Sequence, residues 1–411
     1  MKRIFILISC LILLIRGLAL EPCQTITLNA SYSGNSSEPD VNGGLIYQSL
    51  DQLMSDLAPL VAANQTCNVY SVIVHPGSYY HNNDVSFEGK GSNYSLSFRK
   101  ATMEKDPVIF QFHQANMTFN SFISLEFQDI QFSFDTDFGG LTISNGTECN
   151  IANVDIKDTK QTPKGYSRIN VTGVTTTTIS NFSVYFRHSS FFISVRAGQQ
   201  TNVSLQLSNI RIEYALQNKP RNDPPKNYFI FAYKIQNLSA KNISISSIRD
   251  TTNNSLLQIF LYGPALLAES VTNVSISGVS ISLHTTYYSH LFKFYQIQTL
   301  SLSKLNLTDN KFLNSKDPSI FEISNATNMT FNQISMSNTY MESLDQKFHL
   351  LFRINAYGAW SDITIDDLSI SGNNELQNAS VFSIIEIFRK IKFRNVSISG
   401  LNMTSGIILR A

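Results

Sequence analysis

The chain has 411 residues, of which 43% are hydrophobic and 15% are charged, and its formal net charge is +1. That length and apolar fraction are sufficient to bury a large hydrophobic core. A net charge so close to zero excludes a global electrostatic preference for nucleic acid or for an anionic membrane surface. We therefore expect no nucleic-acid partner, and binding sites must be sought in local patterns.

Residues 1–19 have the pattern of a secretory signal peptide. Lys2 and Arg3 precede a short apolar run over residues 4–15, and small residues at 17–19 match a signal-peptidase site. A membrane anchor is the alternative, but this run is too short to cross ~30 Å of hydrocarbon. We expect no transmembrane segment beyond the signal peptide, and a secreted, extracellular or cell-surface location.

The cysteines are consistent with an oxidising compartment. Cleavage after the signal peptide removes Cys10 and leaves Cys23, Cys67 and Cys149. An odd number means that one thiol stays unpaired or pairs elsewhere. We expect a disulfide between Cys23 and Cys67, which both lie in the N-terminal region, and we interpret Cys149 as a buried, unreactive thiol.

The sequence contains 19 Asn-x-Ser/Thr acceptor motifs for N-glycosylation. Such motifs are modified on the surface of secreted proteins. We favour the motifs in predicted loops as glycosylation sites: Asn35, Asn64, Asn93, Asn253 and Asn378.

The N-terminal region predicts a helix followed by a strand. Residues 49–62 read SLDQLMSDLAPLVA, with Ser49 and Gln52 spaced as a capping box. One face of this helix would be apolar, formed by Leu50, Leu53, Met54, Leu57 and Val61. The following stretch VYSVIVHPGSYY (69–80) predicts a strand and a turn.

Ten copies of one apolar pattern occupy the rest of the chain. Each copy reads apolar, x, apolar, two residues, apolar, x, apolar, and the starts are 24 to 36 residues apart, which is typical of a solenoid. Of the forty apolar slots, only Thr177 is plainly polar. The copies are LEFQDIQF (125–132), CNIANVDI (149–156), TTISNFSV (177–184), LQLSNIRI (205–212), LSAKNISI (238–245), VSISGVSI (274–281), LSLSKLNL (300–307), MTFNQISM (329–336), ITIDDLSI (363–370) and IKFRNVSI (391–398).

The two residues between the apolar pairs predict a corner. Alternation places each pair on one face of a strand, and two extra residues turn the next pair inward as well. A corner this tight favours a left-handed backbone, which Gly, Asn and Asp tolerate best. The second corner residue is Asp129, Asn153, Asn181, Asn209, Asn242, Gly278, Lys304, Gln333, Asp367 or Asn395. At Asn181, Asn242 and Asn395 we therefore expect a backbone role, although each begins a glycosylation motif.

These features resemble the right-handed parallel β-helix of the pectin-lyase-like superfamily. A further β-rich run precedes many copies, such as YFIFAYKI (228–235), so each coil would have three short strands. The resemblance implies an all-β fold with residues 20–110 as the N-terminal cap and first coils and 111–411 as the repeats. The helix at 49–62 would cover the first coil. No helix is predicted to cover the last coil, and an uncapped coil invites edge pairing, so we expect either that the natural chain continues or that this edge pairs with a partner. A leucine-rich repeat is the alternative, because residues 302–312 and 365–376 fit that consensus.

Family enzymes that act on acidic polysaccharides carry adjacent outward carboxylates. Here the outward residue after each corner is mostly serine, and serine without a histidine base is not a nucleophile. The best acidic cluster is Glu126, Asp135, Asp137 and Asp155, as a weak catalytic candidate or a calcium site. The histidines are scattered, so we expect no metal site apart from this calcium alternative and no cofactor.

We interpret the protein as a secreted or cell-surface glycoprotein whose β-helix serves binding, adhesion or extracellular structure, with glycans or surface proteins as partners. Carbohydrate binding follows from the resemblance alone. The alternative is a polysaccharide lyase, hydrolase or esterase of the same superfamily.

Overall fold

The computed structural model describes residues 24–31, 45–62, 68–89, 94–102, 104–134, 136, 139–158, 167–186, 191–214, 228–247, 266–282, 285–287, 291–313, 319–341, 349–355, 361–372, 374–376, 379–385, 388–403 and 409–410. Several sequence-based predictions fall outside these residues. They concern the signal peptide at 1–19, Cys23, Cys67, Asp135, Asp137, Asn35, Asn64, Asn93, Asn253 and Asn378.

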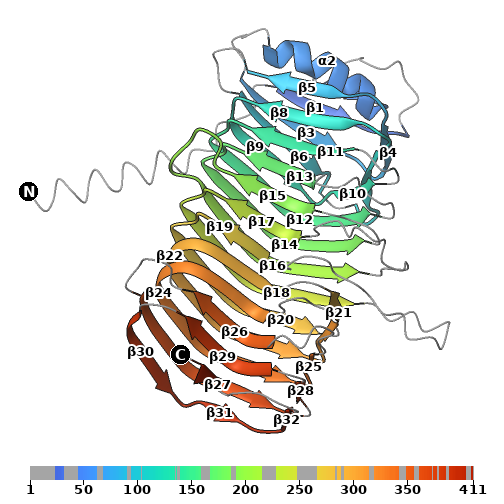
Figure 1. Cartoon of the computed structure of the whole chain (residues 1–411). Coiled ribbons are helices and arrows are strands. Elements are labelled where there is room, and N and C mark those ends of the chain that lie inside the picture. The colour runs from blue at the N-terminus through green and yellow to red at the C-terminus, as the bar shows by residue number, and fades with distance from the viewer. Residues whose placement is uncertain are drawn as a thin grey trace, which may run out of the picture.

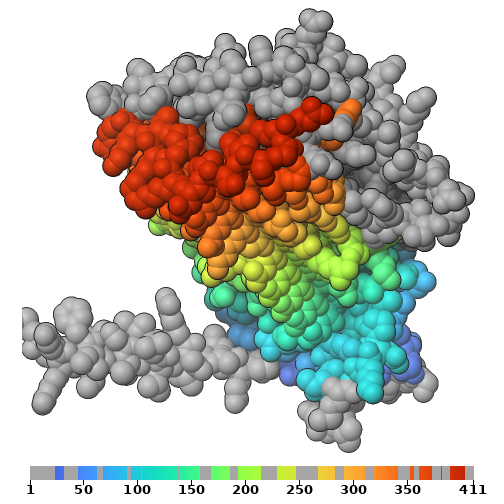
Figure 2. Space-filling model, turned by 90° about the horizontal axis from the view of Figure 1, so that it is seen from below, coloured from blue at the N-terminus to red at the C-terminus, as the bar shows by residue number. Residues whose placement is uncertain are grey.

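The described strands pair in parallel and stack coil upon coil along one axis, which makes the protein an all-β parallel β-helix (Figure 1). Parallel neighbours require a crossover connection, and here each crossover is the remainder of one coil. The space-filling view shows the coils as successive colour bands from the N-terminal to the C-terminal end (Figure 2). Pairing continues across residue 110, because β7 (Val108–Phe112) pairs with β4 (Gly77–His81) and with β10 (Gln131–Phe134).

Each coil contributes to three sheets. The first sheet begins with β2 (Leu45–Tyr47), β1 (Gln24–Leu28), β3 (Val69–Val74), β6 (Tyr94–Lys100) and β9 (Phe122–Gln128). It continues through the parts before the corner of β12 (Glu148–Asp158), β14 (Thr176–Phe186), β16 (Ser204–Tyr214), β18 (Asn237–Ser247), β20 (Asn273–Ser282), β22 (Phe292–Thr308), β24 (Ser319–Ser337) and β27 (Ser361–Ser371), and then β30 (Phe388–Arg394).

The second sheet stacks β4, β7 and β10, then the parts after the corner of the same long strands, and then β31 (Ser397–Ile398). The third sheet contains β5 (Val85–Glu88), β8 (Asn116–Asn120), β11 (Gly140–Ser144), β13 (Ser167–Thr172), β15 (Phe191–Arg196), β17 (Tyr228–Tyr233), β19 (Leu266–Glu269), the first parts of β22 and β24, β26 (His349–Asn355), β29 (Ala379–Ile385) and β33 (Leu409–Arg410).

A small separate sheet joins five short strands from consecutive coils. These are β21 (Thr285–Tyr287), β23 (Lys311–Leu313), β25 (Tyr340–Met341), β28 (Asn374–Leu376) and β32 (Leu401–Met403). Three stacked parallel sheets exclude the leucine-rich repeat, which forms one strand per repeat and a single sheet. None of the described helices has the length and apolarity needed to cross a membrane.

The corner residues between the first and second sheets have a left-handed backbone. All ten have φ between 48° and 68°. Their side chains form a ladder: the amide of Asn181 donates to Asn153 at 2.9 Å, and the amide of Asn242 donates to Asn209 at 3.0 Å. Near the far end, Asn395 donates to Asp367 at 2.9 Å. Asparagine thus tolerates the left-handed conformation and also links neighbouring coils.

The repeated apolar slots fill the bore of the solenoid. In the first nine copies every slot is buried, including Thr177, whereas Phe393 and Val396 of the last copy are exposed by 39% and 36%. Identical rings stack between coils, as in Phe98 with Phe127 at 5.2 Å between ring centroids, and Phe321 with Phe352 at 4.8 Å. Such stacks contribute beyond the burial of apolar area alone.

The helix α2 (Leu50–Ala62) covers the N-terminal end of the bore and packs against β2, β4 and β5 (Figure 1). Its buried residues are the five of the predicted apolar face. The backbone N–H of Gln52 donates to Ser49 Oγ at 3.5 Å, which is the first half of the expected capping box. Asp51 Oδ1 lies 3.0 Å from Nδ1 of His81, a fully buried residue of β4, so a hydrogen bond links the helix to the first coil.

Candidate functional site

The outer surface of the second sheet carries mainly hydroxyl groups. The residues that follow the corners form one column in register: Gln131, Asp155, Ser183, Arg211, Ser244, Ser280, Asn306, Ser335, Ser369 and Ser397. Charges in this column occur only at Asp155 and Arg211, and Arg211 forms an ion pair with Glu213, an outward residue of the same strand.

The structure does not bring Glu126 and Asp155 together. Glu126 lies on β9 of the first sheet, where its Oε2 accepts a hydrogen bond from Arg99 Nε at 2.9 Å. Asp155 follows the corner at Asn153 and lies on the second sheet. The corner turns the chain between them, so the two carboxylates project from different faces. Of the two members of the predicted acidic cluster that the structure describes, Asp155 lies at the pocket described next and Glu126 does not.

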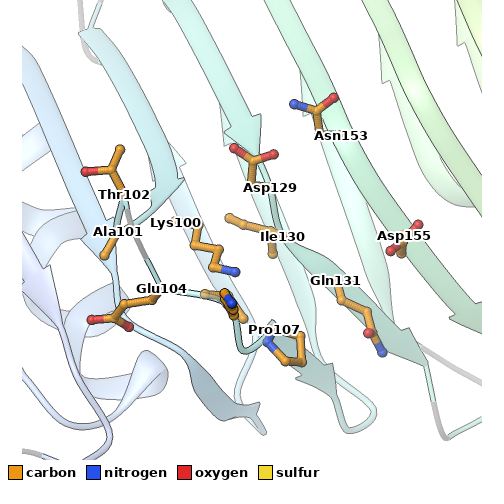
Figure 3. Close-up of a pocket in the computed structure, with 12 residues that line it drawn as sticks. Lys100, Ala101, Thr102, Glu104, Pro107, Asp129, Ile130, Gln131, Asn153 and Asp155 are labelled. Carbon is orange, nitrogen blue, oxygen red and sulfur yellow. The ribbon is translucent and has the colours of Figure 1, made fainter.

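A pocket of about 440 Å³ lies beside the first corners (Figure 3). We call it the corner pocket, and it is lined by Lys100, Ala101, Thr102, Glu104, Lys105, Pro107, Val108, Asp129, Ile130, Gln131, Asn153 and Asp155. It exists because β6 and β7 are joined by residues 101–107 rather than by a two-residue corner. This wider turn forms one wall, and the tight corners at Asp129 and Asn153 form the opposite wall.

The corner pocket contains charges of both signs. Neither Lys100 nor Lys105 forms an ion pair among the described residues, and Lys100 extends toward the middle of the pocket in Figure 3. Glu104 instead lies 2.9 Å from His75 Nδ1, measured from its Oε1. Asp155 accepts a hydrogen bond from the Ser183 hydroxyl, and Asp129 stands at its corner with φ of 59°.

The lining of the corner pocket contains both hydrogen-bond donors and hydrogen-bond acceptors. Ammonium groups and side-chain amides donate, and carboxylates and amide oxygens accept. Two carboxylates, Asp129 and Asp155, come from adjacent coils, which is the minimum for acid and base chemistry on a sugar. The sequence reasoning missed Lys100, Glu104 and Lys105. The available signal was the charged stretch KATMEKDP (100–107), which lacks the asparagine corner of later coils.

A metal centre and a reactive thiol find no support in the described residues. No three His, Cys, Asp or Glu side chains within the described ranges gather to hold a metal ion. Cys149 is fully buried and unpaired. Burial raises the pKa of the Cys149 thiol to about 12, and the Glu148 carboxylate adds to the shift, so the thiol stays protonated and unreactive at neutral pH.

Comparisons with known proteins assign no family. A scan of protein-family models and a search of curated proteins found no match. Among solved structures, the chain is similar to the catalytic unit of a thermostable GH87 alpha-1,3-glucanase from Streptomyces thermodiastaticus strain HF3-3. The identity is 11%, over 95% of this chain and 70% of that chain, with a TM-score of 0.29. The fold assignment therefore rests on the strand pairings of this chain.

Proposed function

We propose that this protein is a secreted or cell-surface glycoprotein that uses its β-helix as a scaffold to bind glycans, and that the corner pocket is a sugar-binding site. The observation that carries the proposal is the lining of this pocket. Lys100 and Lys105 are free to donate, Asp129 and Asp155 offer acceptor oxygens, and Asn153 provides both. Sugar hydroxyls donate and accept at the same atom, and such a mixed lining matches them.

Membership of the pectin-lyase-like superfamily is part of this proposal. It is supported by three stacked parallel sheets, by the two-residue asparagine corner, and by stacked apolar and aromatic side chains in the bore. Fold alone does not assign an activity. The function is therefore argued from the pocket and not from the superfamily.

Secretion is the second part of the proposal, and it is supported by the signal-peptide pattern and by the glycosylation motifs. A disulfide between Cys23 and Cys67 would also indicate secretion. β1 begins one residue after Cys23 and β3 begins two residues after Cys67, and these two strands are neighbours in the first sheet. We expect mass spectrometry of protein secreted by eukaryotic cells to find a Cys23–Cys67 disulfide and sugars on Asn35, Asn64, Asn93, Asn253 and Asn378. An intracellular, unmodified product would refute secretion.

Glycan binding is tested with an array of neutral and acidic oligosaccharides, followed by calorimetric titration of the best-bound one. Lys105→Ala removes a free donor, and Asp129→Asn removes a charge while keeping a residue that tolerates the corner. Each change should weaken binding about tenfold, which corresponds to about 1.4 kcal/mol. Lys157→Ala is the matched control, because Lys157 lies on the same sheet outside the pocket.

Equal affinities in all three variants would place the binding site elsewhere, and no binding to any glycan would reject the proposal. The enzyme alternative is examined in the same titration by analysing the oligosaccharide for cleavage or loss of ester groups. Turnover that disappears in Asp155→Asn would make the corner pocket an active site instead of a binding site.

A further inference from the structure

A second surface with suitable chemistry lies at the edge of the third sheet, where its strands turn toward the first sheet. The last residues of four consecutive strand segments stand in register there: Arg196 of β15, Tyr233 of β17, Glu269 of β19 and Tyr295 of β22. We call these four residues, with the adjacent turn residues Lys234 and Gln296, the tyrosine strip.

The side chains of the tyrosine strip point outward. In β22, Phe292 and Phe294 are buried in the bore, so the alternating Lys293 and Tyr295 face away from it. Tyr295 is 37% exposed, which is unusual in a chain whose described aromatic residues are mostly buried. Tyr233 and Glu269 are half-buried. The tyrosine rings of the strip are therefore partly buried against neighbouring side chains and partly accessible to a ligand.

Neighbouring groups hold the Tyr233 ring in place. Phe231 stacks beside it with centroids 6.1 Å apart and an interplanar angle of 15°. Lys234 Nζ lies 5.0 Å from the centroid of the Tyr233 ring, a favourable cation–π contact. A preorganised ring loses little rotational freedom when a ligand stacks on it.

Polar groups without partners lie between and beside the two rings. Among the described residues, neither the Glu269 carboxylate nor the Tyr295 hydroxyl forms a hydrogen bond or an ion pair. Glu269 occupies the coil between Tyr233 and Tyr295. Along the solenoid axis, the strip therefore presents the ring of Tyr233, then the acceptor oxygens of Glu269, and then the ring of Tyr295.

We propose that the tyrosine strip binds a linear, uncharged glycan that runs along the solenoid axis, with one sugar ring on Tyr233 and another on Tyr295. The two tyrosines are two coils apart, or about 9–10 Å, so one extended oligosaccharide can contact both. The apolar face of a pyranose packs on an aromatic ring, and its hydroxyls can donate to Glu269. The carboxylate of Glu269 disfavours an acidic group on the part of the glycan that lies between the two rings, and the cations of Arg196 and Lys234 lie over the rings of Phe231 and Tyr233.

A protein partner fits this surface less well. Stable protein interfaces bury roughly 800 Å² on each partner around an apolar core, whereas this strip is one residue wide and is interrupted by a charge. The inference rests on the proposed function only in the class of ligand, because the strip and the corner pocket lie on different sheets and share no residue.

The test is calorimetric titration of the full secreted chain with cellohexaose and laminarihexaose, and with polygalacturonate as the acidic comparator. Tyr233→Ala and Tyr295→Ala should each weaken binding of the neutral hexasaccharide at least tenfold, and Tyr295→Phe should retain it. The matched controls are Tyr80→Ala, which removes a tyrosine exposed by 56% on another sheet, and Lys105→Ala in the corner pocket. Unchanged thermal midpoints would show that the variants fold.

The outcomes separate the two proposals. Neutral binding that is lost in the Tyr233 and Tyr295 variants but kept in Lys105→Ala supports the strip. Binding that depends only on Lys105, or binding of polygalacturonate alone, overturns the strip and leaves the corner pocket. Absence of any glycan binding rejects both proposals, and a change in self-association in the tyrosine variants would make the strip a protein interface.

Discussion

The side-chain amide of Asn209 donates to the side-chain oxygen of Asn181, one coil earlier, at 2.7 Å. Asn209 in turn accepts from Asn242 at 3.0 Å. Each of these corner amides therefore both donates and accepts along the axis. Hydrogen bonds arranged in such a chain polarise one another and become stronger together.

Replacing Asn209 by alanine should destabilise the protein by about 3–4 kcal/mol. Alanine at φ of 54° costs about 1–2 kcal/mol, and each of the two lost hydrogen bonds contributes about 1 kcal/mol. Thermal unfolding and hydrogen exchange of the adjacent coils measure the loss. Asn209→Gly should cost less than Asn209→Ala, because glycine accepts the left-handed backbone. If alanine and glycine have the same effect, the backbone conformation does not matter at this corner.

The glycine in the same ladder gives a second prediction. Gly278 has φ of 68°, and a Cβ there would lie 2.8 Å from Asn242 Oδ1 and 3.3 Å from Asn242 N. Gly278→Ala should therefore lower stability by about 1–2 kcal/mol, and Gly278→Asn should recover part of this by extending the ladder. Chemical denaturation of both variants beside Ser277→Ala tests the order, and an alanine variant as stable as the parent would contradict it.

Thr177 predicts a stabilising substitution. It is fully buried in an apolar slot, and its Oγ1 has no hydrogen-bond partner among the residues that the structure describes. A buried unpaired hydroxyl costs about 1–3 kcal/mol, so the isosteric Thr177→Val should raise the free energy of unfolding by about that amount. Thr177→Ser keeps the hydroxyl and removes a methyl group, and it should be less stable than the parent. A destabilised valine variant would show that the hydroxyl is bonded in solution.

The buried thiol of Cys149 should make the free energy of unfolding decrease with pH in the alkaline range. Its thiol has a pKa of about 12 in the folded chain, raised by burial from the ordinary value of 9.0. Above pH 9 the unfolded chain loses this proton and the folded chain keeps it, so the free energy of unfolding falls as pH rises. The loss is about 1.4 kcal/mol for each pH unit between 9 and 12.

Unfolding of the parent and of Cys149→Ala at pH 8 and pH 10 measures this dependence. Tyrosines and lysines titrate in both proteins, so the difference between the two slopes reports Cys149. The alanine variant should lose less stability over this interval. Identical slopes would mean that the thiol ionises with an ordinary pKa in the folded chain.

The repeat could be predicted from the sequence because the bore and the corner select residue types strongly. The second left-handed turn, between the third and first sheets, was missed. It holds Ser121, Asn145, Gly173, Lys234, Ser270, Gln296 and Asn325, all with positive φ. All seven lie eight residues before a corner residue, as Ser121 does before Asp129. The fixed offset of eight residues could have located this turn in the sequence. Residue type could not, because the turn position is occupied by Ser, Asn, Gly, Lys and Gln, and many side chains tolerate one left-handed position at modest cost.

The candidate site could not be predicted because it depends on a departure from the repeat. The corner pocket exists where one coil has a longer turn; Lys105 belongs to that turn, and Lys100 is the last residue of the strand before it. Grouping Glu126 with Asp155 failed for a reason that the pattern itself contains: residues on the two sides of a corner lie on different sheets. The repeat predicts which residues face the bore and which face outward, whereas the charged residues of the corner pocket lie where the repeat is interrupted.

Apart from the N-terminal end, where β1 lies between β2 and β3, each coil pairs only with the coils directly before and after it among the described residues. A pulling force applied between the two ends of the chain would detach the terminal coils one at a time, because each coil is held only by its contacts with the neighbouring coils. The force needed should therefore be low and nearly constant, with length released in steps of one coil, so the protein should extend under load rather than behave as a rigid rod.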